Sequence, residues 1–117
     1  MKDENCIFCK IANGEVDTEM VYEDETCAAF KDASPQTPVH VLVVPKDHYA
    51  SIADDVPSEV KGRLFDAAVK VAGICGVADS GFRLIVNTGE DASQTVRHWH
   101  IHVCGGEKMP EGMFPGK

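Results

Sequence analysis

The sequence predicts an α+β fold in which one main helix covers a mostly antiparallel sheet of about five strands. Short runs rich in apolar and β-branched residues alternate with turn residues, which is typical of strands. A single longer segment, residues 57–76, has apolar residues at spacings of three and four, the period of an amphipathic helix. Since 117 residues suit one domain, we expect a single domain over residues 1–117, with tails at 1–4 and 107–117.

The first predicted elements are short. Residues 5–13 are expected to form a brief helix that ends at Gly14 and places Cys6 and Cys9 on one side. Two strands are predicted next, at residues 21–22 and 26–30, with an acidic turn between them.

The remaining elements frame the main helix. Residues 32–38 are predicted to be a loop because two X-Pro steps disfavour helix, and the apolar run 39–44 is predicted to be a buried strand that Pro45 ends. The helix is expected to have Asp55 or Ser58 as its cap and to end at Gly76. Its apolar stripe comprises Val60, Leu64, Ala67, Ala68, Val71, Ile74 and Cys75. The last two strands are predicted at 82–86 and 98–103.

Charge and cysteine content exclude several classes of protein. The net charge is −8, and the three arginines form no basic run, so we expect no nucleic-acid polymer as partner. No apolar run approaches the roughly 20 residues that span a bilayer, so we expect no membrane partner. Residues 1–5 lack the apolar stretch of a secretion signal, and five cysteines suit a disulfide framework badly. We therefore expect a cytoplasmic protein with reduced thiols.

The cysteines divide into a pair and three single residues. Cys6-x-x-Cys9 has the spacing of a metal-binding or redox pair. Cys27, Cys75 and Cys104 have no partner by spacing, and we expect them to be buried apolar residues.

Three of the five histidines alternate within one predicted strand, as His98, His100 and His102. Alternate side chains of a strand share a face, so the imidazoles are expected to project together at intervals of roughly 6.5–7 Å. Trp99, Ile101 and Val103 would then enter the core. Imidazole is a nucleophile, an acid or base near neutral pH, and a metal ligand. The row is therefore consistent with phosphoryl or nucleotidyl transfer, with a three-histidine metal site, or with a merely polar sheet face.

At these residues the sequence resembles the histidine triad family, whose motif is His-φ-His-φ-His-φ-φ, where φ is an apolar residue. Residues 98–104 match all seven positions as His-Trp-His-Ile-His-Val-Cys. Residues 30–40 resemble the family's nucleoside-binding loop and the strand after it, and residues 43–48 resemble its next segment. The resemblance extends from about residue 6 to residue 106, and favours the branch of small nucleotide-binding hydrolases with the α+β fold of that family.

The resemblance implies hydrolysis of purine nucleoside phosphoramidates and related nucleotidyl conjugates through a nucleotidyl-histidine intermediate. His100 would be the nucleophile, His102 would hydrogen-bond the phosphate, His98 would support the strand, and His40 would complete the polar network. Neither magnesium nor an organic cofactor is implied. The implied nucleotide-binding residues are Asp32 for the ribose, Ile7, Phe8 and Phe30 for an AMP- or GMP-like purine base, and Asn87, Gln94 and Thr95 for the phosphate or leaving group.

Some members that resemble this chain carry a structural zinc on two cysteines and two histidines. The matching positions are Cys6, Cys9, His48 and His98, so the resemblance implies zinc here. Because His98 cannot serve zinc and phosphate through one nitrogen, we assign His98 to the metal and leave the chemistry to His100 and His102. A homodimer is also implied, with the helix over 57–76 as a candidate contact.

Two departures from the family pattern concern specificity. Ser93 stands where close relatives usually have glycine, and the tail over 107–117 diverges from the family's tail. The rate and the leaving-group preference therefore do not transfer. Dinucleoside polyphosphate hydrolysis and a zinc-stabilised nucleotide-binding module with little turnover stay open as alternatives. A transferase is disfavoured, because His102 stands where that branch usually has glutamine.

Overall fold

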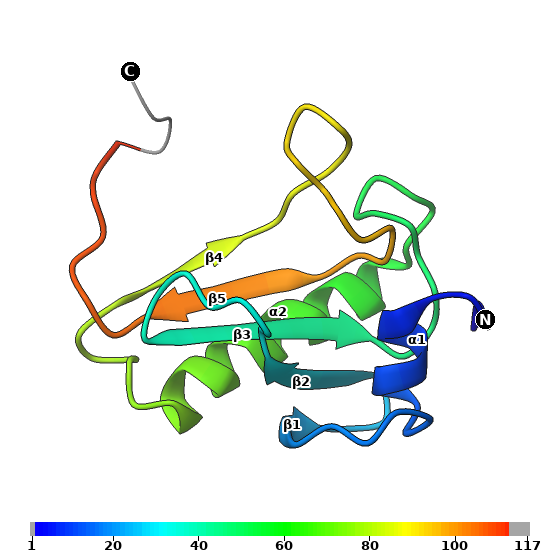
Figure 1. Cartoon of the computed structure of the whole chain (residues 1–117), viewed down its shortest axis with the longest axis horizontal. Helices are drawn as coiled ribbons and strands as arrows, with labels where there is room; N and C mark the ends of the chain where they lie inside the picture. The colour runs from blue at the N-terminus through cyan, green and yellow to red at the C-terminus, as the bar shows by residue number, and fades with distance from the viewer. Residues whose placement is uncertain (1, 113–117) are drawn as a thin grey trace.

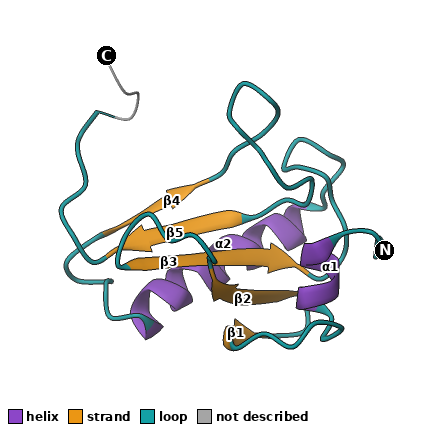
Figure 2. Cartoon of the chain, viewed as in Figure 1, coloured by secondary structure: helices purple, strands orange, loops and turns teal. Residues whose placement is uncertain are grey.

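The computed structural model describes residues 2–112. Five strands form one antiparallel sheet in the order β1-β2-β3-β5-β4. Helix α2 lies across one face of this sheet, and the short helix α1 lies near the start of β2 and the end of β3 (Figures 1 and 2). The predicted fold class is confirmed. The bounds are α1 Ile7–Ala12, β1 Met20–Glu23, β2 Cys27–Lys31, β3 Val39–Pro45, α2 Ser58–Ile74, β4 Phe82–Ile85 and β5 Ile101–Gly105.

The central strands are covered on both faces. On one face Ala29, Val41 and Val43 belong to the main core, together with apolar residues of α2 and β5. On the other face a smaller cluster joins α1 to the sheet through Phe8, Ala12, Ala28, Phe30, Leu42 and Val44. Double coverage explains why β3 is apolar at every position from Val41 to Pro45 rather than alternating. Beyond α1, this second face also carries His40 and His102.

Helix α2 differs from its prediction at both ends. Its N-cap is Pro57, with no side-chain capping bond, so the predicted caps Asp55 and Ser58 are wrong. The proline holds an extended backbone at the cap position, and Ser58 is already the first helical residue. Gly76 follows the helix with φ of +76°, as expected for a terminating glycine. Ile74 is 58% exposed, so it does not belong to the buried stripe.

The strand that carries the triad begins later than predicted. β5 starts at Ile101, and residues 98–100 precede it. The reason is that the partner strand β3 ends at Pro45, whose carbonyl accepts a hydrogen bond from the His98 ring at 2.9 Å. The backbone N–H of Trp99 instead donates to the Tyr49 carbonyl at 2.7 Å. Trp99, Ile101 and Val103 are buried, as predicted.

The other differences are small. The bounds of α1, β1, β2, β3 and β4 shift by one or two residues from their predictions. The short helix ends at Ala12, with Asn13 as its C-cap in place of the predicted end at Gly14. Cys27 and Cys104 are buried as expected, whereas Cys75 is only half-buried. Within residues 2–112 no helix combines the length and apolar character needed to cross a bilayer. The part of the predicted tail beyond residue 112 lies outside the described residues.

Candidate active site

The histidine row lies where β3 and β5 pair, on the face opposite α2. His102 stands opposite Leu42, and His40 lies two residues away from Leu42 on β3, so the two histidines share a face. The ring centroids of His40 and His102 are 5.1 Å apart, and those of His102 and His100 are 5.0 Å apart. The rings of His100 and His102 are thus closer than the predicted strand spacing, because His100 lies outside the regular strand.

Hydrogen bonds fix which nitrogen of each ring carries the proton. The backbone N–H of Gln36 donates to Nδ1 of His40 at 2.9 Å, so the proton of a neutral His40 is on Nε2. That Nε2 lies 2.8 Å from Nδ1 of His102, which must accept. The proton of His102 is therefore on Nε2, which makes this atom a donor. Burial, reinforced by the neighbouring His100 and His40, lowers the pKa of His102 to about 4, so the ring is neutral near pH 7.

His100 has the opposite arrangement. Its Nδ1 lies 2.7 Å from the carbonyl oxygen of His98 and must donate, which leaves a lone pair on Nε2. Within residues 2–112, the one side-chain nitrogen or oxygen that is fully buried without a partner is Trp99 Nε1. Among the described residues, no protein group hydrogen-bonds Nε2 of His100, and the residue as a whole is 7% exposed. A buried imidazole with an open lone pair can act as a nucleophile.

Further predicted residues surround these rings. The side-chain Nδ2 of Asn87 lies 3.5 Å from Nε2 of His102; both atoms are donors with this proton position, so they are neighbours that do not hydrogen-bond each other. The Asp32 carboxylate accepts from the Ser34 backbone N–H at 2.8 Å, and its other oxygen lies 3.4 Å from Nε2 of His40. The structure therefore brings a carboxylate, an amide and the histidine row together.

Aromatic residues border the row on the side of α1. The Phe8 ring packs edge-on against the rings of His100 and Phe30, with ring centroids 5.2 Å and 5.6 Å apart, respectively. Ile11 packs against the same cluster and was not predicted as a site residue. Its position one helical turn after Ile7 is a signal that could have found it.

Within residues 2–112, Gln94, Thr95 and Ile7 make no hydrogen bond or ring contact with the histidine row. The buried Gln94 amide donates to the carbonyls of Ala50 and Val96, and its oxygen accepts from the Gly89 N–H, so the side chain holds loops together. Thr95 is exposed, and Ile7 is 48% exposed. Both border a cavity of about 380 Å³ that also includes Cys6, His48 and Arg97.

The four predicted metal ligands converge. The Cys6 Sγ lies 3.3 Å from Nδ1 of His98, and the Cys9 Sγ lies 3.3 Å from Nδ1 of His48 and 3.4 Å from Nδ1 of His98. The four ligand atoms lie within 4.8 Å of one another. Two ligands of a tetrahedral zinc ion, one sulfur and one nitrogen, are separated by about 3.6 Å. The arrangement therefore fits a zinc ion with small adjustments.

Protonation in this cluster also suits a cation. Nε2 of His98 lies 2.9 Å from the Pro45 carbonyl and donates to it, which leaves Nδ1 as the ligand atom. Burial lowers the pKa of His98 to about 4, which keeps the ring neutral. Burial also raises the pKa of the Cys9 thiol to about 11, so a thiolate here needs a nearby positive charge.

A second group, Asp32, His40 and His102, also has its polar atoms within 4.8 Å. Its two nitrogens are 2.8 Å apart, whereas two nitrogens on a tetrahedral zinc ion are about 3.3 Å apart. Its atoms already form a directed hydrogen-bond chain, so this group is a polar network rather than a metal site.

Ser93 has φ of +62°, the only positive value among the described non-glycine residues. The residue that departs from the family pattern thus occupies a backbone conformation that favours glycine. It directly precedes Gln94, which anchors the loop before the triad.

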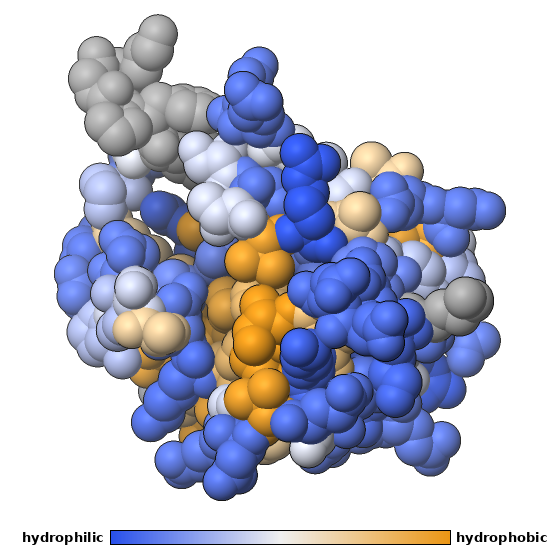
Figure 3. Space-filling model, turned by 45° about the vertical axis from the view of Figure 1, so that its right-hand side comes forward, coloured by the Kyte–Doolittle hydropathy of each residue, from blue (hydrophilic) through white to orange (hydrophobic). Residues whose placement is uncertain are grey.

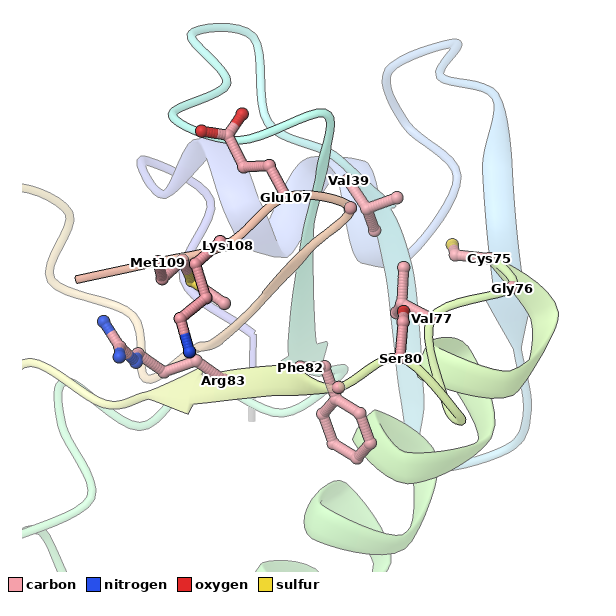
Figure 4. A pocket seen from close by; sticks show the side chains of 12 residues that line it. Val39, Cys75, Gly76, Val77, Ser80, Phe82, Arg83, Glu107, Lys108 and Met109 are labelled. Carbon is pink, nitrogen blue, oxygen red and sulfur yellow. The ribbon is translucent and has the colours of Figure 1, made fainter. Parts of the chain in front are cut away.

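Another cavity, of about 750 Å³, lies between the C-terminal end of α2, the start of β4 and residues 106–109 (Figure 4). Arg83 and Lys108 border it, and no histidine does. We therefore place no chemistry there.

Comparisons with known proteins identify the family of the chain. The HIT domain matches residues 13–109. Purine nucleoside phosphoramidase of Escherichia coli is 38% identical to this chain over 109 residues, which cover 91% of each chain. A HIT-like protein of Synechocystis is 43% identical over 105 residues, which cover 88% of this chain and 91% of the relative.

Solved structures are similar as well. A histidine triad protein from Clostridium difficile has a TM-score of 0.92, and a HIT family hydrolase from Clostridium thermocellum has a TM-score of 0.91. Each is 43% identical and covers 97% of this chain and 100% of its own. With its complete triad motif, the chain therefore belongs to the HIT family.

Proposed function

We propose that the chain hydrolyses purine nucleoside phosphoramidates and related nucleotidyl conjugates, with His100 as the nucleophile. The observation that carries this proposal is the 2.7 Å hydrogen bond from Nδ1 of His100 to the His98 carbonyl. It leaves the Nε2 lone pair unprotonated beside the His102 donor. The similarity to a purine nucleoside phosphoramidase supports the substrate class.

In the first step, Nε2 of His100 attacks the phosphorus, and the bond from phosphorus to the leaving nitrogen breaks. That nitrogen takes a proton from a water molecule, which leaves a hydroxide ion. The product is a nucleotidyl-imidazolium, whose Nδ1–H faces the His98 carbonyl. A water molecule then attacks the phosphorus and gives a proton to the hydroxide ion, and the bond to Nε2 breaks to release the nucleoside monophosphate and the neutral imidazole. Two easier displacements thus replace one difficult step. His102 Nε2–H donates to a non-bridging oxygen in both steps.

The surrounding residues bind the nucleotide. The Asp32 carboxylate accepts from the ribose hydroxyls, which favours ribose over deoxyribose. Phe8 and Phe30, with Ile7 at the rim, provide apolar contact for the purine base. Asn87 and Thr95 contact the phosphate or leaving group, and Gln94 supports their loop through its internal bonds.

We also propose that Cys6, Cys9, His48 and His98 hold a structural zinc ion. Four protein ligands leave no open position for a reacting water, so the ion would neutralise the thiolates and tie α1 to the sheet. The proposed hydrolysis needs neither magnesium nor an organic cofactor.

The chain is further proposed to be a cytoplasmic homodimer. β4 is an edge strand of the sheet, and Val69 and Ile74 of α2 are more than half exposed. Both features offer surface to a second copy. Five cysteines, an odd number, suit a disulfide framework badly, and this supports the cytoplasm.

Steady-state release of AMP from an adenosine phosphoramidate tests the function. We expect His100→Ala to abolish release while AMP binding, measured by calorimetry, survives. If the unaltered protein binds AMP but releases none from the phosphoramidate, the proposal is wrong and a binding module is the better account. Faster turnover of a dinucleoside polyphosphate would favour that alternative substrate.

A further inference from the structure

The proposed metal ligands and the proposed nucleophile contact the same aromatic ring. Phe8 lies between Cys6 and Cys9 in sequence, and its ring centroid is 6.0 Å from that of His98 and 5.2 Å from that of His100. His98 also faces both groups, since its Nδ1 meets the two sulfurs and its carbonyl accepts from His100. Two short physical connections therefore join the sulfur pair to His100.

The position of α1 depends on these connections. A helix of six residues is far below the length that is stable alone in water, which is roughly 12 residues or more. Its attachment to the sheet includes the packing of Phe8 and Ala12, the hydrogen bond that the Asn13 side chain donates to the Lys46 carbonyl at 3.0 Å, and the contacts that the two cysteine sulfurs make with two histidine rings. Loss of the sulfur contacts would leave α1 held at its C-terminal end by the Asn13 bond, while Phe8, near its N-terminal end, would be held by packing.

The sulfur pair is placed so that it can be oxidised. Cys6 is half-buried and borders the cavity of about 380 Å³, so a small oxidant can reach its sulfur. The two sulfurs lie within 4.8 Å, and the backbone N–H of Cys9 donates to the Cys6 Sγ at 3.4 Å. A Cys-x-x-Cys pair at the start of a helix can close a disulfide without movement of any other element. Figure 3 shows a band of hydrophobic residues bordered by hydrophilic ones on the face of the molecule that it presents.

We propose that Cys6 and Cys9 form an oxidation-sensitive clasp, in which a peroxide converts the two thiolates to a disulfide, releases the metal and frees Phe8 from His100. The proposal rests on the zinc site proposed above. The Cys6 thiolate attacks a peroxide oxygen to give a sulfenic acid, and the Cys9 thiolate then displaces its hydroxyl. Hydrogen peroxide takes two electrons from the sulfurs and, with two protons, leaves as two waters. The divalent ion departs because both thiolate ligands are gone.

The test uses the full, reduced, zinc-loaded chain with ¹⁵N-labelled histidine. After hydrogen peroxide is added, zinc release is measured with a chromogenic chelator, and the disulfide is mapped by mass spectrometry. NMR follows the Nδ1–H signal of His100. We expect one zinc released for each Cys6–Cys9 disulfide, with broadening or loss of the His100 signal. Reductant and zinc should restore the initial spectrum.

Cys75→Ser is the matched control, because Cys75 is also half-buried but lies outside the cluster. This variant should respond as the unaltered chain does. Zinc retained after peroxide treatment, a disulfide that leaves the His100 signal unchanged, or a response abolished by Cys75→Ser would each overturn the proposal. None of these signals depends on turnover, so the result is independent of whether the hydrolysis proposal holds. Failure of the reduced chain to bind zinc would instead overturn the zinc site itself, and the clasp with it.

Discussion

His40 is expected to control the proton position of His102, and its removal tests the hydrogen-bond chain. His40 is buried, with 6% exposure, and its Nε2–H donates to Nδ1 of His102 at 2.8 Å. In His40→Ala, Nδ1 of His102 loses its partner, and a partly buried polar atom left unpaired costs about 1–3 kcal/mol. If that cost falls on the transition state, kcat/KM drops about 5- to 150-fold.

The assay is kcat/KM for an adenosine phosphoramidate, with unfolding in urea measured in parallel. His40→Gln is the matched control, because a side-chain amide N–H can also donate to Nδ1 of His102. We expect glutamine to restore a substantial part of the lost kcat/KM. An alanine variant with unchanged kcat/KM, or a glutamine variant as impaired as alanine, would refute the proposed control by His40.

Three further predictions concern the loop, the pH response and the sugar. Ser93→Gly should raise the free energy of unfolding by up to about 1 kcal/mol, because the strain relieved at this left-handed position exceeds the entropy that glycine adds to the unfolded chain. Ser93→Ala, the control, should give no gain in the free energy of unfolding. A glycine variant that is less stable than the unaltered chain would contradict this prediction. The pKa of His102 is lowered in the folded state, so the unfolded state binds more protons between about pH 6.5 and 4, and stability should fall as pH falls through this window. His102→Asn should remove part of that slope in pH-dependent urea unfolding, and an unchanged slope would contradict the shift. AMP should bind at least about tenfold more tightly than dAMP in calorimetry, and Asp32→Asn should lower this ratio of affinities. Equal affinities of the unaltered chain for AMP and dAMP would exclude the proposed ribose contact.

The fold class was predictable because local patterns and tertiary packing agree. The apolar run of β3 and the helical stripe of α2 each match the surface that the element buries. The start of β5 could not be predicted in the same way. His98 and Trp99 look like strand residues locally, but their polar groups bind Pro45 and Tyr49, which are distant in sequence.

The candidate site was likewise predictable in part from the sequence. The alternation of histidines identified the row, and the family resemblance identified His40 and the four candidate metal ligands. Spacing alone does not reveal that His98 supplies a ring to the sulfurs and a carbonyl to His100, because these contacts depend on the turn before β5. Nor does it reveal that the Gln94 amide is fully used by loop carbonyls and an N–H.

The covalent step of the proposed mechanism can be observed directly. Zinc-loaded protein is mixed with adenosine phosphoramidate labelled at the phosphorus, quenched during the first turnover, and digested under conditions that preserve phosphorus–nitrogen bonds. The account predicts that the label is bound to Nε2 of His100 and is absent from the His100→Ala variant. Label on another residue, or product formed in that turnover with no labelled protein at any time, would contradict it.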